Sequence, residues 1–223
     1  MKETVLAAPF AGQSASVTTN RVIRNTYMLL SMTLLFSGFT ASISMLFNLP
    51  HPGLLLTLGG YFGLLFLTTK YRDSGIGLAC VFALTGFMGY TLGPIINAYL
   101  SMANGPQIVM TAMGSTGVIF LGLSAYALIS RKDFSFMSGF LMVGILVAFA
   151  AGLGAIFFEM PALSLAVSSM FVLLMSGLIL YQTSSMIHGG ETNYIMATVT
   201  LYVSIFNLFT SLLHLLGFMN SGE

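Results

Sequence analysis

The chain has 223 residues, of which 57% are hydrophobic and only 6% are charged. Soluble domains carry about 25% charged residues, so this composition excludes a soluble globular protein. The formal net charge of +1 gives no indication of nucleic-acid binding. The single cysteine, Cys80, excludes a disulfide within the chain.

Seven apolar segments follow one another along the chain, separated by charged clusters and by turns rich in proline and glycine. A helix needs about 20 apolar residues to cross a bilayer, and these segments have about that length. We place them at 26–47, 53–69, 76–100, 107–130, 135–158, 162–186 and 194–216. The sequence therefore predicts an all-α integral membrane protein, with a seven-helix transmembrane domain at 23–223 that is embedded in the lipid bilayer.

The segment before the first span has a different character. Its first 20 residues contain no continuous apolar run of the kind found in a cleavable signal peptide. Residues 1–22 also lack periodic apolar content, which predicts a disordered tail. A processive protease on the same side of the membrane could grip such a tail.

The lysine and arginine residues predict the orientation in the membrane. If the spans alternate, all seven fall on one side, and they are Lys2, Arg21, Arg24, Lys70, Arg72, Arg131 and Lys132. Because positive charges gather on the cytoplasmic side, we expect a cytoplasmic N-terminus. The loop at 187–193 contains neither lysine nor arginine, so a re-entrant seventh segment stays an alternative to a full crossing.

The predicted spans lack the groups that catalysis or pumping needs. No Asp, Glu, Lys or Arg lies deep in any of them, whereas proton-driven pumps use ionisable groups near the membrane centre. Two serine–glycine pairs lack the preceding glycine of a nucleophile turn, and His188 with Glu191 makes only an incomplete metal site. We therefore expect no enzyme and no catalytic, metal-binding or cofactor-binding residue. Thr192 or Asn193 is expected to cap the last helix.

Glycines and a proline predict how some helices pack. Two Gly-x-x-x-Gly motifs, Gly59 with Gly63 and Gly89 with Gly93, place small residues on one helix face and indicate close helix contacts. Pro94 follows directly and predicts a kink, because a proline inside a helix leaves the carbonyl four residues earlier without its partner. Kinks of this kind are usually structural, although they also occur at cavities and gates.

The last span carries one stripe of polar residues. Their spacings of 4, 3, 4 and 3 place them on a single helix face, and they are Thr200, Ser204, Asn207, Ser211 and His214. Polar groups facing lipid would be costly, so this face must meet protein or water. We interpret it as a central helix bonded to its neighbours, and the alternative is the lining of a hydrated path.

Three stretches together resemble the transmembrane Bax-inhibitor family. They are Gly86-Phe87-Met88-Gly89-Tyr90-Thr91-Leu92-Gly93-Pro94-Ile95, then Tyr181-Gln182-Thr183, and finally Leu201-Tyr202-Val203-Ser204-Ile205-Phe206-Asn207-Leu208-Phe209. The tract His188-Gly189-Gly190-Glu191-Thr192-Asn193-Tyr194-Ile195 resembles one bacterial branch of the family more closely. The resemblance implies a seven-helix fold with the last helix in the middle of the bundle, and a place in the bacterial inner membrane.

The resemblance also implies two different functions. Members of the bacterial branch bind the membrane protease FtsH and modulate its degradation of membrane proteins, which implies a membrane protease complex as partner. Other relatives are pH-sensitive calcium leaks that use two aspartates in the last two helices. By motif, these aspartates fall on Gln182 and Ser204, neither of which ionises near neutral pH. We therefore favour the protease-modulating function, with the ion leak as the alternative.

Overall fold

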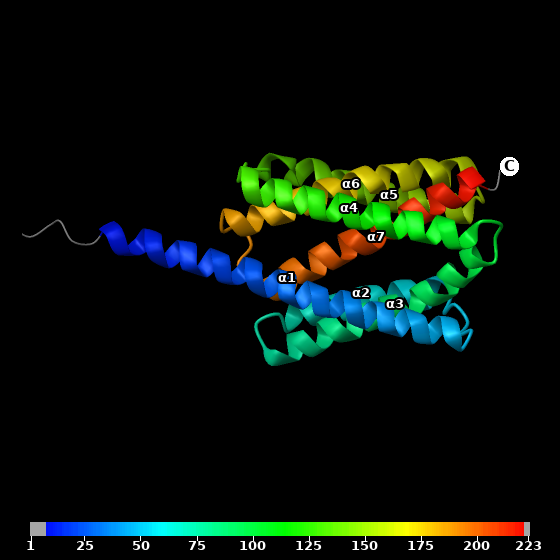
Figure 1. The fold of residues 1–223 in the computed structure, drawn as a ribbon, viewed down its shortest axis with the longest axis horizontal. Helices are drawn as coiled ribbons and strands as arrows, with labels where there is room; N and C mark the ends of the chain where they lie inside the picture. Colours follow the sequence, from blue (N-terminus) through cyan, green and yellow to red (C-terminus); the bar gives the residue numbers. More distant parts are fainter. Residues whose placement is uncertain (1–7, 221–223) are drawn as a thin grey trace, which may run out of the picture.

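The structure is a computed structural model that describes residues 8–220. Within that range it contains seven α-helices, one short 3-10 helix and no strand. The helices are α1 (Ala8–Leu46), α2 (Leu54–Lys70), α3 (Gly75–Leu100), α4 (Gly105–Ser130), α5 (Ser138–Phe157), α6 (Pro161–Ile187) and α7 (Tyr194–Asn220), and the 3-10 helix η1 (Ser135–Met137) precedes α5. They form the elongated bundle of Figure 1, which confirms the predicted all-α fold.

Six of the helices are long and apolar enough to cross a membrane. The exception is α2, whose 17 residues extend about 25 Å at 1.5 Å per residue. By contrast, α7 has 27 residues and runs from the end that holds the α6–α7 loop to the opposite end of the bundle, where the C-terminus lies (Figure 1). The seventh segment is therefore not re-entrant in this structure.

Helix α7 lies at the centre of the bundle. It contacts α1, α3, α4 and α6, and it separates the layer of α1, α2 and α3 from the layer of α4, α5 and α6 (Figure 1). Among the six long helices, α7 also has the largest fraction of buried residues in its apolar stretch. Polar side chains on a helix with neighbours on several sides can meet protein instead of lipid, and this agrees with the interpretation of the α7 stripe.

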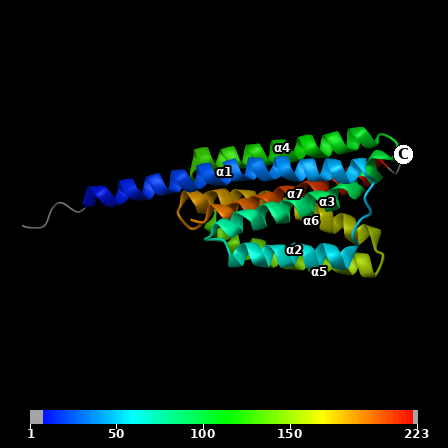
Figure 2. The same ribbon diagram turned by 90° about the horizontal axis from the view of Figure 1, so that it is seen from below.

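The N-terminal segment differs from the predicted disordered tail. Helix α1 begins at Ala8, so residues 8–22 are helical, while residues 1–7 lie outside the described part of the chain. Pro9 stands in the first turn, where a missing N–H breaks no intrahelical bond. No proline or glycine lies between Gln13 and Arg21, so nothing stops the first span from continuing backwards. The start of α1 projects beyond the other helices (Figure 2).

Glycines bring α1 and α3 together. A Cβ added to Gly93 would lie 2.5 Å from the Ser44 side chain, and one added to Gly89 would collide with the backbone of Ser37. The motif Gly89-x-x-x-Gly93 therefore marks a close helix contact, as predicted. The prediction for Gly59-x-x-x-Gly63 is wrong, because a Cβ at either position would meet nothing within 4 Å.

Candidate functional site

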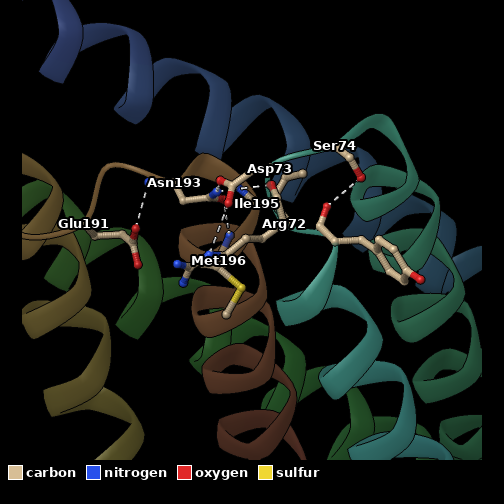
Figure 3. A network of polar contacts seen from close by, with 8 residues as sticks. Arg72, Asp73, Ser74, Glu191, Asn193, Ile195 and Met196 are labelled. Atoms are coloured by element: carbon tan, nitrogen blue, oxygen red, sulfur yellow. Dashed lines mark hydrogen bonds and ion pairs between the residues drawn. The ribbon is translucent and has the colours of Figure 1, made fainter.

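The loops at one end of the bundle are tied together by Asn193 (Figure 3). Its Oδ1 accepts hydrogen bonds from the backbone N–H groups of Ile195 at 3.0 Å and Met196 at 3.1 Å. Asn193 therefore caps α7, which was one of the two predicted caps. Its Nδ2 donates to the Arg72 carbonyl at 3.1 Å and to Asp73 Oδ1 at 2.8 Å. One side chain thus starts the central helix and fixes the α2–α3 loop beside it.

Ser184 holds the α4–α5 loop in a similar way. Its hydroxyl donates to the Lys132 carbonyl at 3.1 Å and accepts from the Phe134 N–H at 3.0 Å. Ser184 is buried near the end of α6, so the loop is anchored on the core. Together with Asn193, it brings the two lysine- and arginine-bearing loops to the end of the bundle from which α1 projects.

Asp133 is held in the same loop. The Ser135 N–H donates to its carboxylate at 2.8 Å. This bond, the side-chain hydrogen bond from Ser135 and the charge of His188 lower the pKa of Asp133. The carboxylate therefore stays ionised at neutral pH, where it stabilises the turn into η1.

His188 and Glu191 do not point to a common metal ion. His188 Nδ1 lies 2.9 Å from the Ser184 carbonyl, whereas Glu191 Oε1 accepts from the Asn193 N–H at 2.8 Å. No group of three His, Cys, Asp or Glu residues that could hold a metal is found among residues 8–220. The two side chains shape the α6–α7 loop.

The polar stripe of α7 is bonded mainly to its own helix and to α6. Ser204 donates to the Thr200 carbonyl at 2.7 Å, and Asn207 Nδ2 donates to the preceding turn at 2.9 Å. His214 Nδ1 lies 2.8 Å from the Ser168 hydroxyl of α6. Ser204 and Ser211 are buried, and the other stripe residues are partly buried. The arrangement agrees with packing better than with a hydrated path.

Gln182 and Ser204 are both buried but are not hydrogen-bonded to each other. Ser204 uses its hydroxyl on Thr200, while Gln182 Nε2 has no hydrogen-bond partner. Gln182 lies five residues before the end of α6 and Ser204 lies ten residues into α7. At 1.5 Å per residue, their positions differ by about 8 Å along the bundle.

Gln182 belongs to a layer of polar groups near the loop end. The Thr183 and Tyr27 hydroxyls lie 3.3 Å apart, joining α6 to α1, and Thr198 of α7 donates to the Thr26 carbonyl at 3.3 Å. Three buried side-chain polar atoms in the described residues lack a hydrogen-bond partner, and they are Thr26 Oγ1, Ser124 Oγ and Gln182 Nε2. Buried polar groups are nearly always paired, so these are the least satisfied groups of the core.

The carbonyl freed by Pro94 finds its partner on another helix. The Ser44 hydroxyl of α1 donates to the Tyr90 carbonyl at 3.0 Å. Asn97, one turn further along α3, donates to the Met45 carbonyl at 3.2 Å. The carbonyl freed by Pro94 is therefore paired within the tight contact of α1 and α3, which supports a structural role for this proline.

Sequence reasoning missed one polar junction in the core. The Tyr202 hydroxyl lies 2.6 Å from the Ser37 hydroxyl and donates to the Thr85 carbonyl at 3.2 Å. All three residues are buried, so this junction joins α7 to α1 and α3. The available signal was Tyr202 in mid-span, away from the interfaces where tyrosine usually lies.

The sequence matches known proteins over almost its whole length. It is 53% identical over 206 residues to the "Modulator of FtsH protease YccA" of Escherichia coli K12, which covers 92% of this chain and 94% of that protein. The same identity and coverage relate it to the "Inner membrane protein YccA" of another Escherichia coli strain. A Pseudomonas aeruginosa protein is 55% identical over 196 residues, 88% of each chain.

A family model points the same way. The model described as "Inhibitor of apoptosis-promoting Bax1" matches residues 19–221, which include all of the span positions and the α6–α7 loop. The resemblance carried by Gly86–Ile95 and the last two helices is thereby confirmed. This integral membrane protein belongs to the Bax-inhibitor family.

Proposed function

We propose that this chain is a non-enzymatic protein of the bacterial inner membrane that interacts with a protease of the FtsH type and modulates its activity. The observation that carries the proposal is the 53% identity, over 92% of the chain, to the protein named as a modulator of FtsH. A match of this extent includes both the transmembrane bundle and the loops that could meet a partner.

The charged end of the bundle offers a contact surface outside the hydrocarbon layer. The α2–α3 and α4–α5 loops are fixed there by Asn193 and Ser184, and the start of α1 projects from the same end (Figure 1). Partners lose less free energy on binding when the surface is already ordered. The positive charges at this end favour a cytoplasmic position, and we propose that the protease grips the N-terminal segment there.

An ion leak of the Bax-inhibitor type is less well supported. The family's two aspartates correspond to Gln182 and Ser204, which cannot exchange a proton near neutral pH. The Ser204 hydroxyl is also already bonded to the Thr200 carbonyl. A selective path is usually lined by carbonyl or charged rings, whereas the α7 stripe carries hydroxyl, amide and imidazole side chains.

The proposed function predicts a change in proteolysis. Raising the level of this chain in bacterial cells should lengthen the half-life of a membrane protein that FtsH degrades, because the modulator occupies the protease. Pulse-chase measurements would show the change, and affinity purification from native membranes should recover FtsH with the tagged chain. An unrelated multi-pass protein produced at the same level is the control. An unchanged half-life with no FtsH recovered would refute the proposal.

The proposed orientation predicts where tags become accessible. Tags at the N-terminus and in the loops at 70–73 and 131–133 should report the cytoplasm, because these segments carry the positive charges. Tags at 48–52 and 101–106 should report the outside. Fusion reporters active on only one side of the membrane would measure this. Arg131 on the outer side would contradict the proposed orientation.

A further inference from the structure

An apolar groove runs along the side of the bundle between α1 and α4. Its volume is about 510 Å³, and central helix α7 forms its floor. Gly38 and Ser42 stand in the α1 wall, Gly117 in the α4 wall, and Phe206 on the floor. The groove exists because α1 and α4 each pack on α3 and α7 and keep glycines where their walls face the gap.

The glycines leave this space open. A Cβ added to Gly38 or to Gly117 would meet nothing within 4 Å. This differs from the α1–α3 contact, where a Cβ on Gly93 would strike Ser44. The room between α1 and α4 is thus wide enough for additional side-chain atoms, and it can also admit a ligand.

The polar groups in the groove wall are already satisfied. Ser42 donates to the Gly38 carbonyl at 2.8 Å, and Thr116 donates to the Ala112 carbonyl at 2.7 Å. Ser37 and Tyr202 are paired at 2.6 Å. A water cluster or an ion needs free donors or acceptors to replace its hydration. The groove therefore suits an apolar ligand.

The groove is continuous with the surface that faces lipid. Leu35 on α1 and Val118 on α4 follow the lining residues Leu34 and Gly117 in the sequence, and they are 76% and 73% exposed. Because the groove opens on this apolar surface of membrane-spanning helices, the molecules that reach its mouth are lipids. An empty apolar space would forfeit dispersion contacts along its whole lining.

The length of the groove suits a hydrocarbon chain that lies along α1. The α1 wall runs from Leu34 to Met45, about 17 Å at 1.5 Å per residue. A helix of a second copy of the chain is the competing occupant, and the dilution experiment below distinguishes it from lipid.

We propose that this groove binds one acyl chain of a membrane lipid, inserted between α1 and α4 against α7. The proposal is independent of the protease-modulating function. Bound in this way, the lipid completes the packing on one side of the central helix, next to the Ser37–Tyr202 junction that joins α7 to α1.

A single tryptophan can report on the bound chain, because the protein contains none. The variant Phe206→Trp places the indole on the groove floor, and Phe66→Trp places it on the lipid-facing side of α2, where Phe66 is 66% exposed. Each purified variant is reconstituted in vesicles of phosphatidylcholine with or without brominated acyl chains, which quench indole fluorescence on contact. We expect the brominated lipid to reduce the fluorescence of Phe206→Trp by a fraction at least half as large as for Phe66→Trp.

Filling the groove should remove the quenching. When Gly38→Leu and Gly117→Leu are added to the Phe206→Trp variant, most of the fluorescence quenching should disappear. The matched control is Gly114→Leu with Gly122→Leu, on the same α4 helix but outside the groove, where an added Cβ also meets nothing within 4 Å. The smaller substitutions Gly38→Ala and Gly117→Ala should remove part of the quenching. They replace the leucine pair in the experiment if the leucine variants do not elute as folded protein.

Three outcomes would overturn the proposal. The first is an unquenched Phe206→Trp beside a quenched Phe66→Trp. The second is quenching that is equal in the filled and control variants. The third is quenching that rises as the protein is diluted in lipid, which would show that a second copy of the chain had covered the groove.

Discussion

Replacing Gly89 by leucine is expected to lower the thermal unfolding midpoint of the purified protein by about 2–14 °C. The new Cβ would collide with the Ser37 carbonyl and the Thr40 hydroxyl, so α1 and α3 would have to separate. Overpacking of this kind costs about 1–3 kcal/mol. Displacing Ser37 would also weaken its 2.6 Å bond to Tyr202, which is worth about 1 kcal/mol.

The opposing effect is smaller. Leucine has a higher helix propensity than glycine by about 0.5–1 kcal/mol, so the net change stays unfavourable. In a chain of this size each kcal/mol shifts the midpoint by about 2–4 °C. The matched control is Gly63→Leu on α2, where an added Cβ meets nothing within 4 Å. Equal midpoints for the two variants, measured in the same detergent, would show that the α1–α3 contact is not tight.

These two glycines also show what the sequence could predict. The motifs Gly59-x-x-x-Gly63 and Gly89-x-x-x-Gly93 are identical in pattern, yet only the second meets another helix. Spacing places residues on one face of a helix but does not say what that face meets. In α2 the glycine at the close approach is Gly60, whose added Cβ would lie 2.5 Å from the Phe87 ring.

A hydrogen bond could be predicted from the sequence where its donor and acceptor lie close together along the chain. The cap of α7 was narrowed to Thr192 or Asn193, and Asn193 makes the bonds, because a cap acts on the N–H groups that follow it. The partner of the carbonyl freed by Pro94 was not predictable. It is Ser44, 46 residues from Tyr90, and only the α1–α3 packing brings it near.

The polar core shows the same limit. The α7 stripe follows from spacing alone, but the unpaired polar atoms of Thr26 and Ser124 lie on single positions of α1 and α4 that no periodicity distinguishes. The helical segment at residues 8–22 was missed for another reason. Apolar periodicity detects a helix that packs against something, whereas the start of α1 extends beyond the other helices (Figure 2).

The largest functional change is expected when carboxylates are introduced at Gln182 and Ser204, the positions on which the resemblance places the two aspartates of the calcium leaks. Gln182 and Ser204 are neutral between about pH 5 and 8, because neither side chain ionises there. Ion flux through the reconstituted protein should therefore be low and nearly independent of pH. The double variant Gln182→Asp with Ser204→Asp should conduct calcium in a pH-dependent way, measured as uptake into liposomes across this pH range.

The physical reason is coupling between two acids in a poorly solvated place. Both positions are buried, and two carboxylates that are brought together there would share a proton over part of the pH range. Ionised, they supply the charged oxygen ligands that calcium prefers. When both carboxylates are protonated, the site loses these charged ligands and should no longer conduct calcium. The neutral variant Gln182→Asn with Ser204→Asn is the control, because it has a similar shape without the charge.

The geometry makes this a demanding test of the ion-leak alternative. Gln182 and Ser204 are separated by about 8 Å along the bundle axis, and Ser204 already donates to the Thr200 carbonyl. Two aspartates could act together only if α6 or α7 shifts, or if water joins them beside the unpaired Gln182 position. Strong pH-gated calcium flux through the unmodified chain would refute the argument, because it would require a path that needs no acidic pair. Flux confined to the aspartate variant would show that the bundle keeps the framework of a leak, and that the residues at these two positions keep it closed.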